Sequence, residues 1–221
     1  MVLCVEVAGY ISENCYFFID EASGAGFVID PGAQADKLLG IIKERNFKIE
    51  KILLTHGHFD HIGAASELSR ALGVPILAHE NAGVYLGEPD YNLSNFTGEE
   101  IIIEDFTPLK DGDKIALASG ACELAVIYAP GHTSDSVVFY SKGQNLAFCG
   151  DLIFRAGFGR TDLPGGDYSA LKASIDGKIF TLPDEVVLYS GHGEPTSVGA
   201  ESEVLAKFSL ILQVKKCEAF Q

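Results

Sequence analysis

The chain has 221 residues, 47% of them hydrophobic, and a formal net charge of −15 from 31 acidic and 16 basic residues. Nucleic-acid binding draws its affinity from lysine and arginine, and no basic cluster occurs apart from Lys215-Lys216, so a nucleic-acid partner is not expected. No run of about 18 apolar residues occurs either, so no membrane span is expected.

The first half of the sequence alternates short apolar runs with stretches in which apolar residues recur at helical spacing. We predict strands at residues 3–7, 15–19, 26–29, 51–54 and 75–78, and helices at 35–46, 62–72 and 81–86. Residues 87–107 are mixed and acidic, which predicts an excursion on the surface.

The second half continues the alternation of strands and helices. We predict strands at 114–118, 122–128, 135–140, 145–149 and 186–189, and helices at 168–175 and 199–214. The candidate ligands described next spread from residue 56 to residue 192 and must meet at one place. We therefore expect one domain over residues 1–221, built from α and β elements.

The segment from Thr55 to His61 is the most informative of the chain. It supplies three of the six histidines, His56, His58 and His61, together with Asp60, and all four side chains can bind a metal ion. It follows an apolar strand and precedes a helix. It therefore lies on a loop, where backbone freedom lets neighbouring side chains turn towards one point.

Three further donors follow predicted strands, each with glycine beside it. His132, Asp151 and His192 come after the apolar runs at 122–128, 145–149 and 186–189. A lone loop histidine is usually a solvated polar residue, but donors at the ends of successive strands can converge on one edge of a sheet. Their joint occurrence predicts a metal site. His79 ends a strand without a partner motif, and we expect it to be structural or solvent-facing rather than a metal ligand.

Taken in order, these motifs resemble those of the metallo-β-lactamase fold hydrolases, and within them the short glyoxalase II-like group. The resemblance rests on six segments: Glu13-Asn14-Cys15-Tyr16, Val28-Ile29-Asp30-Pro31-Gly32, Thr55 to His61, Pro130-Gly131-His132-Thr133, Gly150-Asp151 and Gly191-His192-Gly193. It runs almost from end to end of the chain. It implies an α+β fold, the four-layer αβ/βα sandwich of that superfamily.

The resemblance also implies a site for two divalent metal ions, most simply zinc, with iron or manganese as alternatives. It divides the candidate ligands into two sets joined by one carboxylate: His56, His58 and His132 for one ion, Asp60, His61 and His192 for the other, and Asp151 bridging both. A ligand set without cysteine disfavours a closed structural zinc site. Thr55 and Thr133 are placed either to hydrogen-bond the ligands or to satisfy local backbone.

The segment from residue 154 to residue 167 follows the proposed bridging aspartate, and its glycines predict a loop beside the metal site. It carries two of the four arginines, Arg155 and Arg160, and an arginine there can bind a substrate carboxylate through two hydrogen bonds. The alternative is that Arg160 pairs with Asp162 or Asp167 and stiffens the loop. Phe158 is expected either to line the substrate pocket or to belong to the core.

The resemblance implies hydrolysis of a thioester, S-D-lactoylglutathione or a smaller one, by attack of a metal-bound hydroxide that Asp60 helps to orient. Full-length glyoxalase II enzymes carry a C-terminal extension with basic residues for glutathione. This chain instead reads Gly159-Arg160-Thr161-Asp162 and ends soon after the His192 loop. That is the pattern of the short bacterial-type hydrolases.

The main alternative is a persulfide dioxygenase, because these enzymes share the fold and the Gly-Arg-Thr-Asp run. A single iron would then be held by His56, His132 and Asp151, a set of two imidazoles and one carboxylate that suits oxygen chemistry. The His192 loop favours the hydrolase. A metal-binding protein without catalysis is disfavoured because every ligand position is present.

The cysteines and the N-terminus bear on the compartment. The five cysteines, at positions 4, 15, 122, 149 and 217, form no Cys-x-x-Cys pair, and most lie among apolar neighbours as small buried residues do. The first six residues lack the basic region of a secretory signal. These features predict a reducing, cytoplasmic setting. Cys149, two residues before Asp151, reads as the end of a buried strand rather than as a catalytic thiol.

Overall fold

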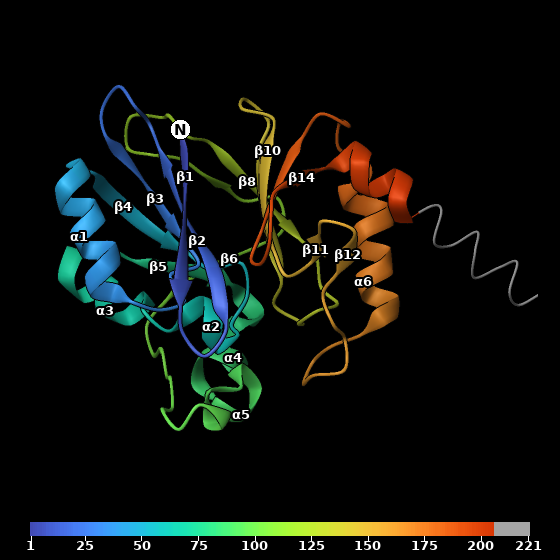
Figure 1. Cartoon of the computed structure of the whole chain (residues 1–221), viewed down its shortest axis with the longest axis horizontal. Helices are drawn as coiled ribbons and strands as arrows, with labels where there is room; N and C mark the ends of the chain where they lie inside the picture. The colour runs from blue at the N-terminus through green and yellow to red at the C-terminus, as the bar shows by residue number, and fades with distance from the viewer. Residues whose placement is uncertain (206–221) are drawn as a thin grey trace, which may run out of the picture.

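A computed structural model describes residues 1–205 and shows two sheets packed face to face (Figure 1). The strands of the first sheet neighbour one another in sequence order: β1 (Val2–Ala8), β2 (Ser12–Ile19), β3 (Ala25–Ile29), β4 (Lys48–Leu53), β5 (Ile76–His79) and β6 (Thr107–Leu109). β1, β2 and β3 pair antiparallel, whereas β3 to β6 pair parallel. The loops that follow β3, β4 and β5 therefore leave the same edge of this sheet.

The second sheet has the spatial order β14 (Thr196–Ser197), β13 (Val187–Ser190), β10 (Leu146–Gly150), β9 (Val137–Ser141), β8 (Leu124–Tyr128) and β7 (Lys114–Ile115). β9 pairs antiparallel with both β8 and β10, and β10 pairs parallel with β13. β8, β10 and β13 consequently run in one direction. The loops that carry His132, Asp151 and His192 follow these three strands, so they leave the sheet at a common edge.

Helices cover the outer face of each sheet. Figure 1 shows α1 (Ala35–Arg45) and α3 (Ala65–Leu72) outside the first sheet, and α6 (Tyr168–Ser174) outside the second, where it continues into the π-helical turn η3 (Ile175–Ile179). The shorter helices lie in the connections: α2 (Phe59–Ile62), η1 (Glu80–Ala82), α4 (Gly83–Gly87), α5 (Pro89–Asn92) and η2 (Ser94–Phe96). The four-layer αβ/βα sandwich of the α+β class is confirmed. Within residues 1–205, none of these helices combines the length and the apolar character needed to span a bilayer.

Three layers of buried apolar side chains separate the four layers of backbone. β2 illustrates the arrangement because its side chains alternate between two of them: Phe17 and Ile19 face the helices, whereas Tyr16 and Phe18 face the other sheet. A third layer lies between the second sheet and α6 and includes Leu171. Strands buried on both faces read as continuous apolar runs in sequence, which explains why most strands were predictable.

The structure departs from the predicted elements in a few places. Residues 59–61, expected on a loop, form the short helix α2 together with Ile62, and the helix predicted at 62–72 begins only at Ala65, as α3. Between the two helices, Ala64 donates its N–H to the Pro31 carbonyl. At Gly63 a Cβ would lie 2.3 Å from the Gly32 carbonyl oxygen, so only glycine permits this approach. The segment after Asp151 forms a small hairpin, β11 (Ile153–Phe154) and β12 (Gly157–Phe158), where we expected only a loop.

The end of the chain is described only in part. The helix predicted at 199–214 begins at residue 198 and is helical as far as residue 205. Its remaining residues, together with Lys215, Lys216 and Cys217, lie outside the described residues.

Candidate metal centre

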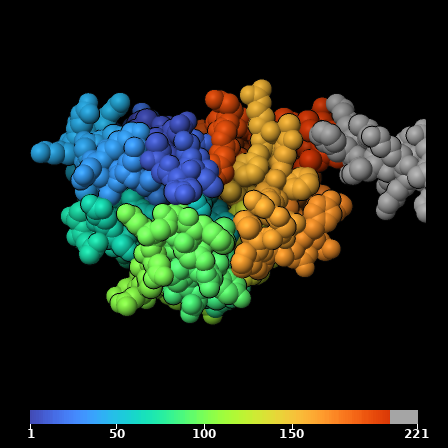
Figure 2. Space-filling model, turned by 60° about the horizontal axis from the view of Figure 1, so that its bottom comes forward, coloured from blue at the N-terminus to red at the C-terminus, as the bar shows by residue number. Residues whose placement is uncertain are grey.

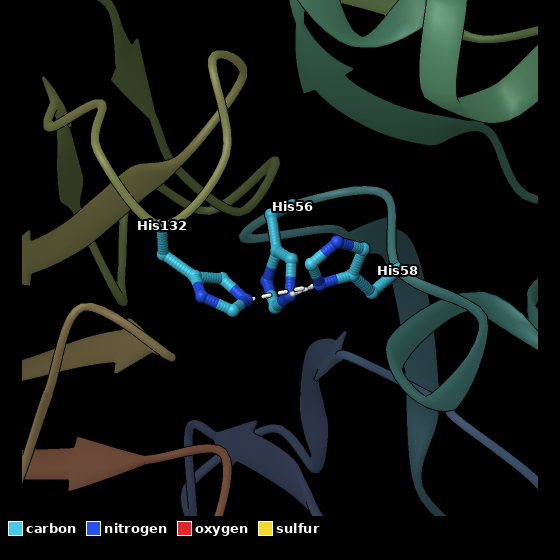
Figure 3. A group of neighbouring side chains, drawn as sticks. All are labelled: His56, His58 and His132. Atoms are coloured by element: carbon cyan, nitrogen blue, oxygen red, sulfur yellow. Dashed lines mark hydrogen bonds between the residues drawn. The ribbon is translucent and has the colours of Figure 1, made fainter. Parts of the chain in front are cut away.

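Three imidazoles meet where the loops of the two sheets come together, and we call His56, His58 and His132 the three-histidine cluster. His56 and His58 lie on the loop after β4, and His132 lies on the loop after β8. Nδ1 of His58 lies 3.2 Å from Nε2 of His56 and 2.9 Å from Nε2 of His132. The three residues are only 2–3% exposed, and Figure 3 shows their rings pointing towards one another.

A second group, which we call the mixed cluster, consists of Asp60, His61 and His192. Asp60 and His61 lie in α2, and His192 follows β13. Oδ2 of Asp60 lies 3.3 Å from Nε2 of His192 and 4.0 Å from Nε2 of His61. The side chain of His61 is fully buried, whereas that of His192 is 27% exposed, so the mixed cluster opens towards solvent at His192.

Asp151 lies between the two clusters and reaches both. Its Oδ1 lies 3.3 Å from Nε2 of His61, and its Oδ2 lies 3.5 Å from Nε2 of His192 and 3.7 Å from Nε2 of His132. A Cβ at Gly191 would lie 2.5 Å from Oδ1, so a larger residue there would displace this carboxylate. The structure thus brings all seven predicted ligands together around one aspartate.

Protein groups alone keep the three-histidine cluster uncharged. Burial lowers the pKa of His56 well below its ordinary value, and the neighbouring imidazoles of His61 and His58 lower it further. Burial, with His132 nearby, lowers the pKa of His58 to about 3, and burial also lowers the pKa of His132. Neutral imidazole is the form that binds metal ions.

The mixed cluster has the opposite electrostatic balance. Burial disfavours the charged form of His192, but hydrogen bonds to Asp151 and Asp60 outweigh it and raise its pKa to about 10. Burial is likewise outweighed at His61, whose pKa the charges of Asp151 and Asp60 hold well above its ordinary value. The same contacts lower the pKa of Asp151 well below its ordinary range despite its burial. A cation entering this cluster therefore competes with protons.

Outer contacts fix which ring nitrogens face the centre. Nδ1–H of His61 donates to Asp30 at 3.0 Å, and Nδ1–H of His132 donates to the backbone carbonyl of Arg160 at 2.8 Å. Asp30 also accepts the backbone N–H of Thr55 at 2.7 Å and its hydroxyl at 2.5 Å. Such contacts orient metal-binding histidines in proteins. The sequence contains Asp30 within a recognised motif, but nothing in it predicts this role.

The donor atoms are arranged to surround cations. The outer hydrogen bonds leave Nε2 of His61 and Nε2 of His132 facing inward, His61 towards a carboxylate oxygen and His132 towards another ring nitrogen. Nε2 of His61 and Oδ1 of Asp151 are buried and have no hydrogen-bond partner within residues 1–205. Lone pairs that face one another at about 3 Å repel unless a proton or a cation lies between them. The residues therefore fit divalent metal ions.

The first hairpin holds the His192 loop. The backbone N–H of Asn14 donates to the Gly191 carbonyl at 2.8 Å, and its side-chain amide donates to the Gly193 carbonyl at 2.8 Å. The hydroxyl of Tyr16 donates to the Ser190 carbonyl at 2.6 Å. Nδ1–H of His192 donates to the carbonyl of Ser12, the first residue of β2, at 2.7 Å. The early motif around Asn14 thus positions a loop at the other end of the chain.

The three residues expected to bind substrate, Arg160, Phe158 and Arg155, lie on the segment after Asp151 and are exposed. The guanidinium of Arg160 is exposed and makes two hydrogen bonds, of 2.7 and 2.8 Å, to Asp162, which is the alternative that the sequence left open. Phe158 is 42% exposed, and its ring lies 6.0 Å from that of Tyr168. Arg155 is exposed and lines a surface depression beside Thr196. The loop also contributes its backbone to the site, through the carbonyl of Arg160 that accepts from His132.

Three other residues that were weighed from the sequence lie outside the two clusters. His79 ends β5, accepts the N–H of Asn81 at 3.2 Å and stacks on Tyr128 at 4.3 Å. Thr133 bonds the hydroxyl of Ser136 at 2.6 Å rather than a candidate ligand. Cys149 is buried, and burial raises the pKa of its thiol to about 12, which makes it a poor nucleophile.

Comparison with known proteins agrees with this geometry. The family model described as the Metallo-beta-lactamase superfamily matches residues 8–192. A probable metallo-hydrolase of Bacillus subtilis, YqgX, is 37% identical over 196 residues, which cover 88% of this chain and 92% of that protein. A hydroxyacylglutathione hydrolase of Haemophilus influenzae, GloC, is 34% identical over 195 residues, which cover 86% of this chain and 89% of that protein.

Solved structures resemble this chain over most of its length. The B3 metallo-beta-lactamase BLEG-1 superposes with a TM-score of 0.86 at 32% identity, covering 92% of this chain and 97% of that one. TTHA1623 in a di-iron-bound form superposes with a TM-score of 0.81 at 33% identity, covering 91% of this chain and 98% of that one. ETHE1 from Myxococcus xanthus superposes with a TM-score of 0.72 at 27% identity, covering 90% of this chain and 81% of that one.

Proposed function

The chain belongs to the metallo-beta-lactamase superfamily, and from this premise we propose that it is a binuclear metal-dependent hydrolase of a thioester. The observation that carries the proposal is the position of Asp151, whose two oxygens lie 3.3 Å from His61 and 3.7 Å from His132. One carboxylate thus joins a cluster of three imidazoles to a cluster of two imidazoles and a carboxylate. When bound, two divalent cations activate a water molecule and polarise the carbonyl that it attacks.

The chain's own residues have distinct roles in this proposal. His56, His58 and His132 hold one ion, Asp60, His61 and His192 hold the other, and Asp151 contributes to both. The charges of His61 and His192 outweigh the burial of Asp60 and lower its pKa, so this carboxylate stays ionised near neutral pH. It can therefore accept a hydrogen bond from the attacking water and orient it, whereas its low basicity makes it a poor proton acceptor.

The substrate class rests on the relatives and on the loop beside the site. The Haemophilus influenzae relative is a hydroxyacylglutathione hydrolase, which supports S-D-lactoylglutathione or a smaller thioester here. The guanidinium of Arg160 is paired with Asp162, so binding a substrate carboxylate through it would require that pair to open. We therefore propose that smaller thioesters are turned over at rates comparable with the glutathione conjugate.

A mononuclear iron dioxygenase acting on a persulfide is the alternative. Its iron would use His56, His132 and Asp151, which lie together, and the di-iron form of TTHA1623 shows that a protein 33% identical to this one holds iron. That assignment leaves His58 and the mixed cluster without a role. The convergence of all seven side chains therefore favours the hydrolase.

One experiment separates the two functions. The purified protein is analysed for metal content and then assayed with a panel of thioesters, with glutathione persulfide in an oxygen electrode and with β-lactams, with chelated protein as the control. We expect about two metal equivalents per chain, and thioester hydrolysis that the chelator abolishes. One equivalent of iron with oxygen uptake would instead establish the dioxygenase, and β-lactam turnover alone would establish a lactamase.

A further inference from the structure

Tyr85 is a buried phenol at which three loops of the site meet. It lies in α4, it is 0% exposed, and it is among the largest fully buried side chains of the described chain. The sequence predicts only a short helix in this region, at residues 81–86. Its contacts nevertheless involve the loops that carry His58 and His132, and the loop that supplies the Arg160 carbonyl.

The ring side of Tyr85 packs against the loop of the first two histidines. A Cβ at Gly57 would lie 2.4 Å from the Cβ of Tyr85, so this backbone rests directly on the tyrosine. The ring centroid lies 6.1 Å from that of His58 at an interplanar angle of 79°, an edge-on arrangement. Since Nδ1 of His58 contacts both other imidazoles of the three-histidine cluster, a shift of this loop would separate their nitrogens.

The hydroxyl of Tyr85 joins the other two loops. It accepts the backbone N–H of Ser134 at 3.0 Å and donates to the Pro164 carbonyl at 3.2 Å. A Cβ at Gly165 would lie 1.9 Å from the hydroxyl oxygen, so the loop from residue 159 to residue 167 is packed closely on it. The same loop supplies the carbonyl of Arg160 that fixes the ring of His132. Figure 2 shows the green segment that contains Tyr85 side by side with the orange segment around residues 160–170.

We propose that Tyr85 is a positioning residue for the three-histidine cluster. Its ring supports His58, and its hydroxyl holds the loop from residue 159 to residue 167 so that the Arg160 carbonyl meets His132. It acts on the metal ion through these two imidazoles and not through contact with substrate. This inference rests on the proposed metal-binding function.

The first test is Tyr85→Phe, which keeps the ring and removes the hydroxyl. Each metal equivalent is titrated in competition with a chromophoric chelator, and Co²⁺ absorption reports the coordination at each position. We expect the equivalent in the three-histidine cluster to bind roughly 10–100-fold more weakly, the range seen when outer contacts of metal ligands are lost. The equivalent in the mixed cluster should change less than threefold, and circular dichroism should be unchanged.

Tyr128→Phe is the matched control. The hydroxyl of Tyr128 also bonds residue 134, donating to the Ser134 carbonyl at 2.9 Å, but within residues 1–205 it makes no hydrogen bond to the loop from residue 159 to residue 167. Both metal affinities should therefore stay within threefold of the parent. Equal weakening by the two substitutions would show that any lost contact to Ser134 suffices, and it would overturn the specific role of Tyr85.

A second variant tests the contact between the hydroxyl and the loop. Gly165 has a φ of +78°, so Gly165→Ala adds both backbone strain and a collision with the Tyr85 oxygen. In the Tyr85→Phe background the 1.9 Å collision with the oxygen is removed, which leaves the strain and a milder contact of 3.2 Å with the ring carbon that carried it. The added loss of metal affinity from Gly165→Ala should therefore be smaller in that background than in the parent, whereas strictly additive losses would contradict the proposed contact.

The outcomes separate this inference from the proposed function. A parent protein that binds two equivalents, with Tyr85→Phe unchanged at both, overturns the role of Tyr85 and leaves the hydrolase standing. A parent that binds no divalent metal overturns both.

Discussion

The two donor clusters share Asp151 but differ in charge and exposure. The three-histidine cluster is buried, and burial lowers the pKa values of its imidazoles, so each ring is neutral and keeps one nitrogen with a free lone pair. The mixed cluster combines ionised carboxylates with imidazoles whose pKa values those carboxylates raise, and it is exposed at His192. The first cluster is thus ready to receive a cation, whereas the second must exchange protons for one.

This difference indicates that the two positions have unequal affinities and unequal responses to pH. In the three-histidine cluster, burial removes the imidazoles from water and keeps them neutral, so an entering cation binds to free lone pairs and displaces few protons. In the mixed cluster, the carboxylates that attract a cation also raise the pKa values of the imidazoles, so these imidazoles retain protons that a cation must displace. The following predictions, from the largest expected effect to the smallest, test that distinction.

Asp151→Ala should have the largest effect because it removes the group common to both clusters. We expect both metal equivalents to be weakened and turnover to fall to the level of chelated protein. Elemental analysis after dialysis, paired with a thioester assay, measures both quantities. Retention of two tightly bound equivalents would mean that the clusters are independent.

His58→Ala and His192→Ala should separate the clusters. Each variant is expected to keep about one equivalent and to lose most of its turnover, because the binuclear arrangement needs both ions. The equivalent that remains in His192→Ala should be the tighter of the two, since it occupies the buried three-histidine cluster. If His58→Ala retains the tighter ion instead, the ranking of the clusters is reversed.

The pH dependence of metal content should distinguish the clusters without a mutation. Raised pKa values mean that His61 and His192 take up protons as the pH falls, and those protons compete with the metal. The low pKa values of His56 and His58 keep the other cluster available at lower pH. Dialysis between pH 9 and pH 5 should therefore remove one equivalent first, and simultaneous loss of both would contradict this order.

A substitution at Asp135 should have a smaller effect, on the pH dependence of the stability of the fold. Asp135 is buried beside Gly57, and burial raises its pKa from 3.8 to about 7 although hydrogen bonds from the Thr133 hydroxyl and from backbone groups lower it. The folded protein therefore keeps a proton that the unfolded chain has lost over this interval, so this group's contribution to stability falls as the pH rises through it.

Asp135→Asn removes that titration. The difference in Tm between the variant and the parent should increase by a few degrees from pH 4 to pH 8. Thermal unfolding in the presence of a chelator measures this difference. For a chain of this size, a Tm shift of about 2–4 °C corresponds to 1 kcal/mol. A Tm difference that is constant across this range would show that Asp135 is ionised when buried.

Arg160→Ala should have the smallest effect. Its guanidinium forms an ion pair with Asp162 that is exposed to solvent, and such pairs contribute little to stability. The contact to His132 uses the backbone carbonyl, which the substitution retains. Metal content should be unchanged and kcat should fall less than about twofold, whereas a large rise in KM would show that the pair opens to bind substrate.

The sequence pattern predicted most strands and the residues that converge, and the family resemblance implied the four layers, but neither predicted the contacts that hold those residues in place. Apolar runs and strand-end donors are local signals, so His132 and His192 could be identified from their own surroundings. The Arg160 carbonyl and the Ser12 carbonyl carry no side-chain signal, and their partners lie 28 and 180 residues away. Tyr85 and Asp135 likewise depend on which loops meet in space. The break after α2 required knowing that Gly63 approaches Gly32.

The hydrogen bonds from β2 to the loop around His192 also have a consequence for folding. They join residues 174 to 180 positions apart, near the two ends of the described chain. At a synthesis rate of 5–20 residues per second, Asn14 leaves the ribosome roughly ten to thirty seconds before Ser190 is made. Contacts of such long sequence separation also form slowly in refolding. Completion of the mixed cluster is therefore expected to be a late event in the biogenesis of the protein.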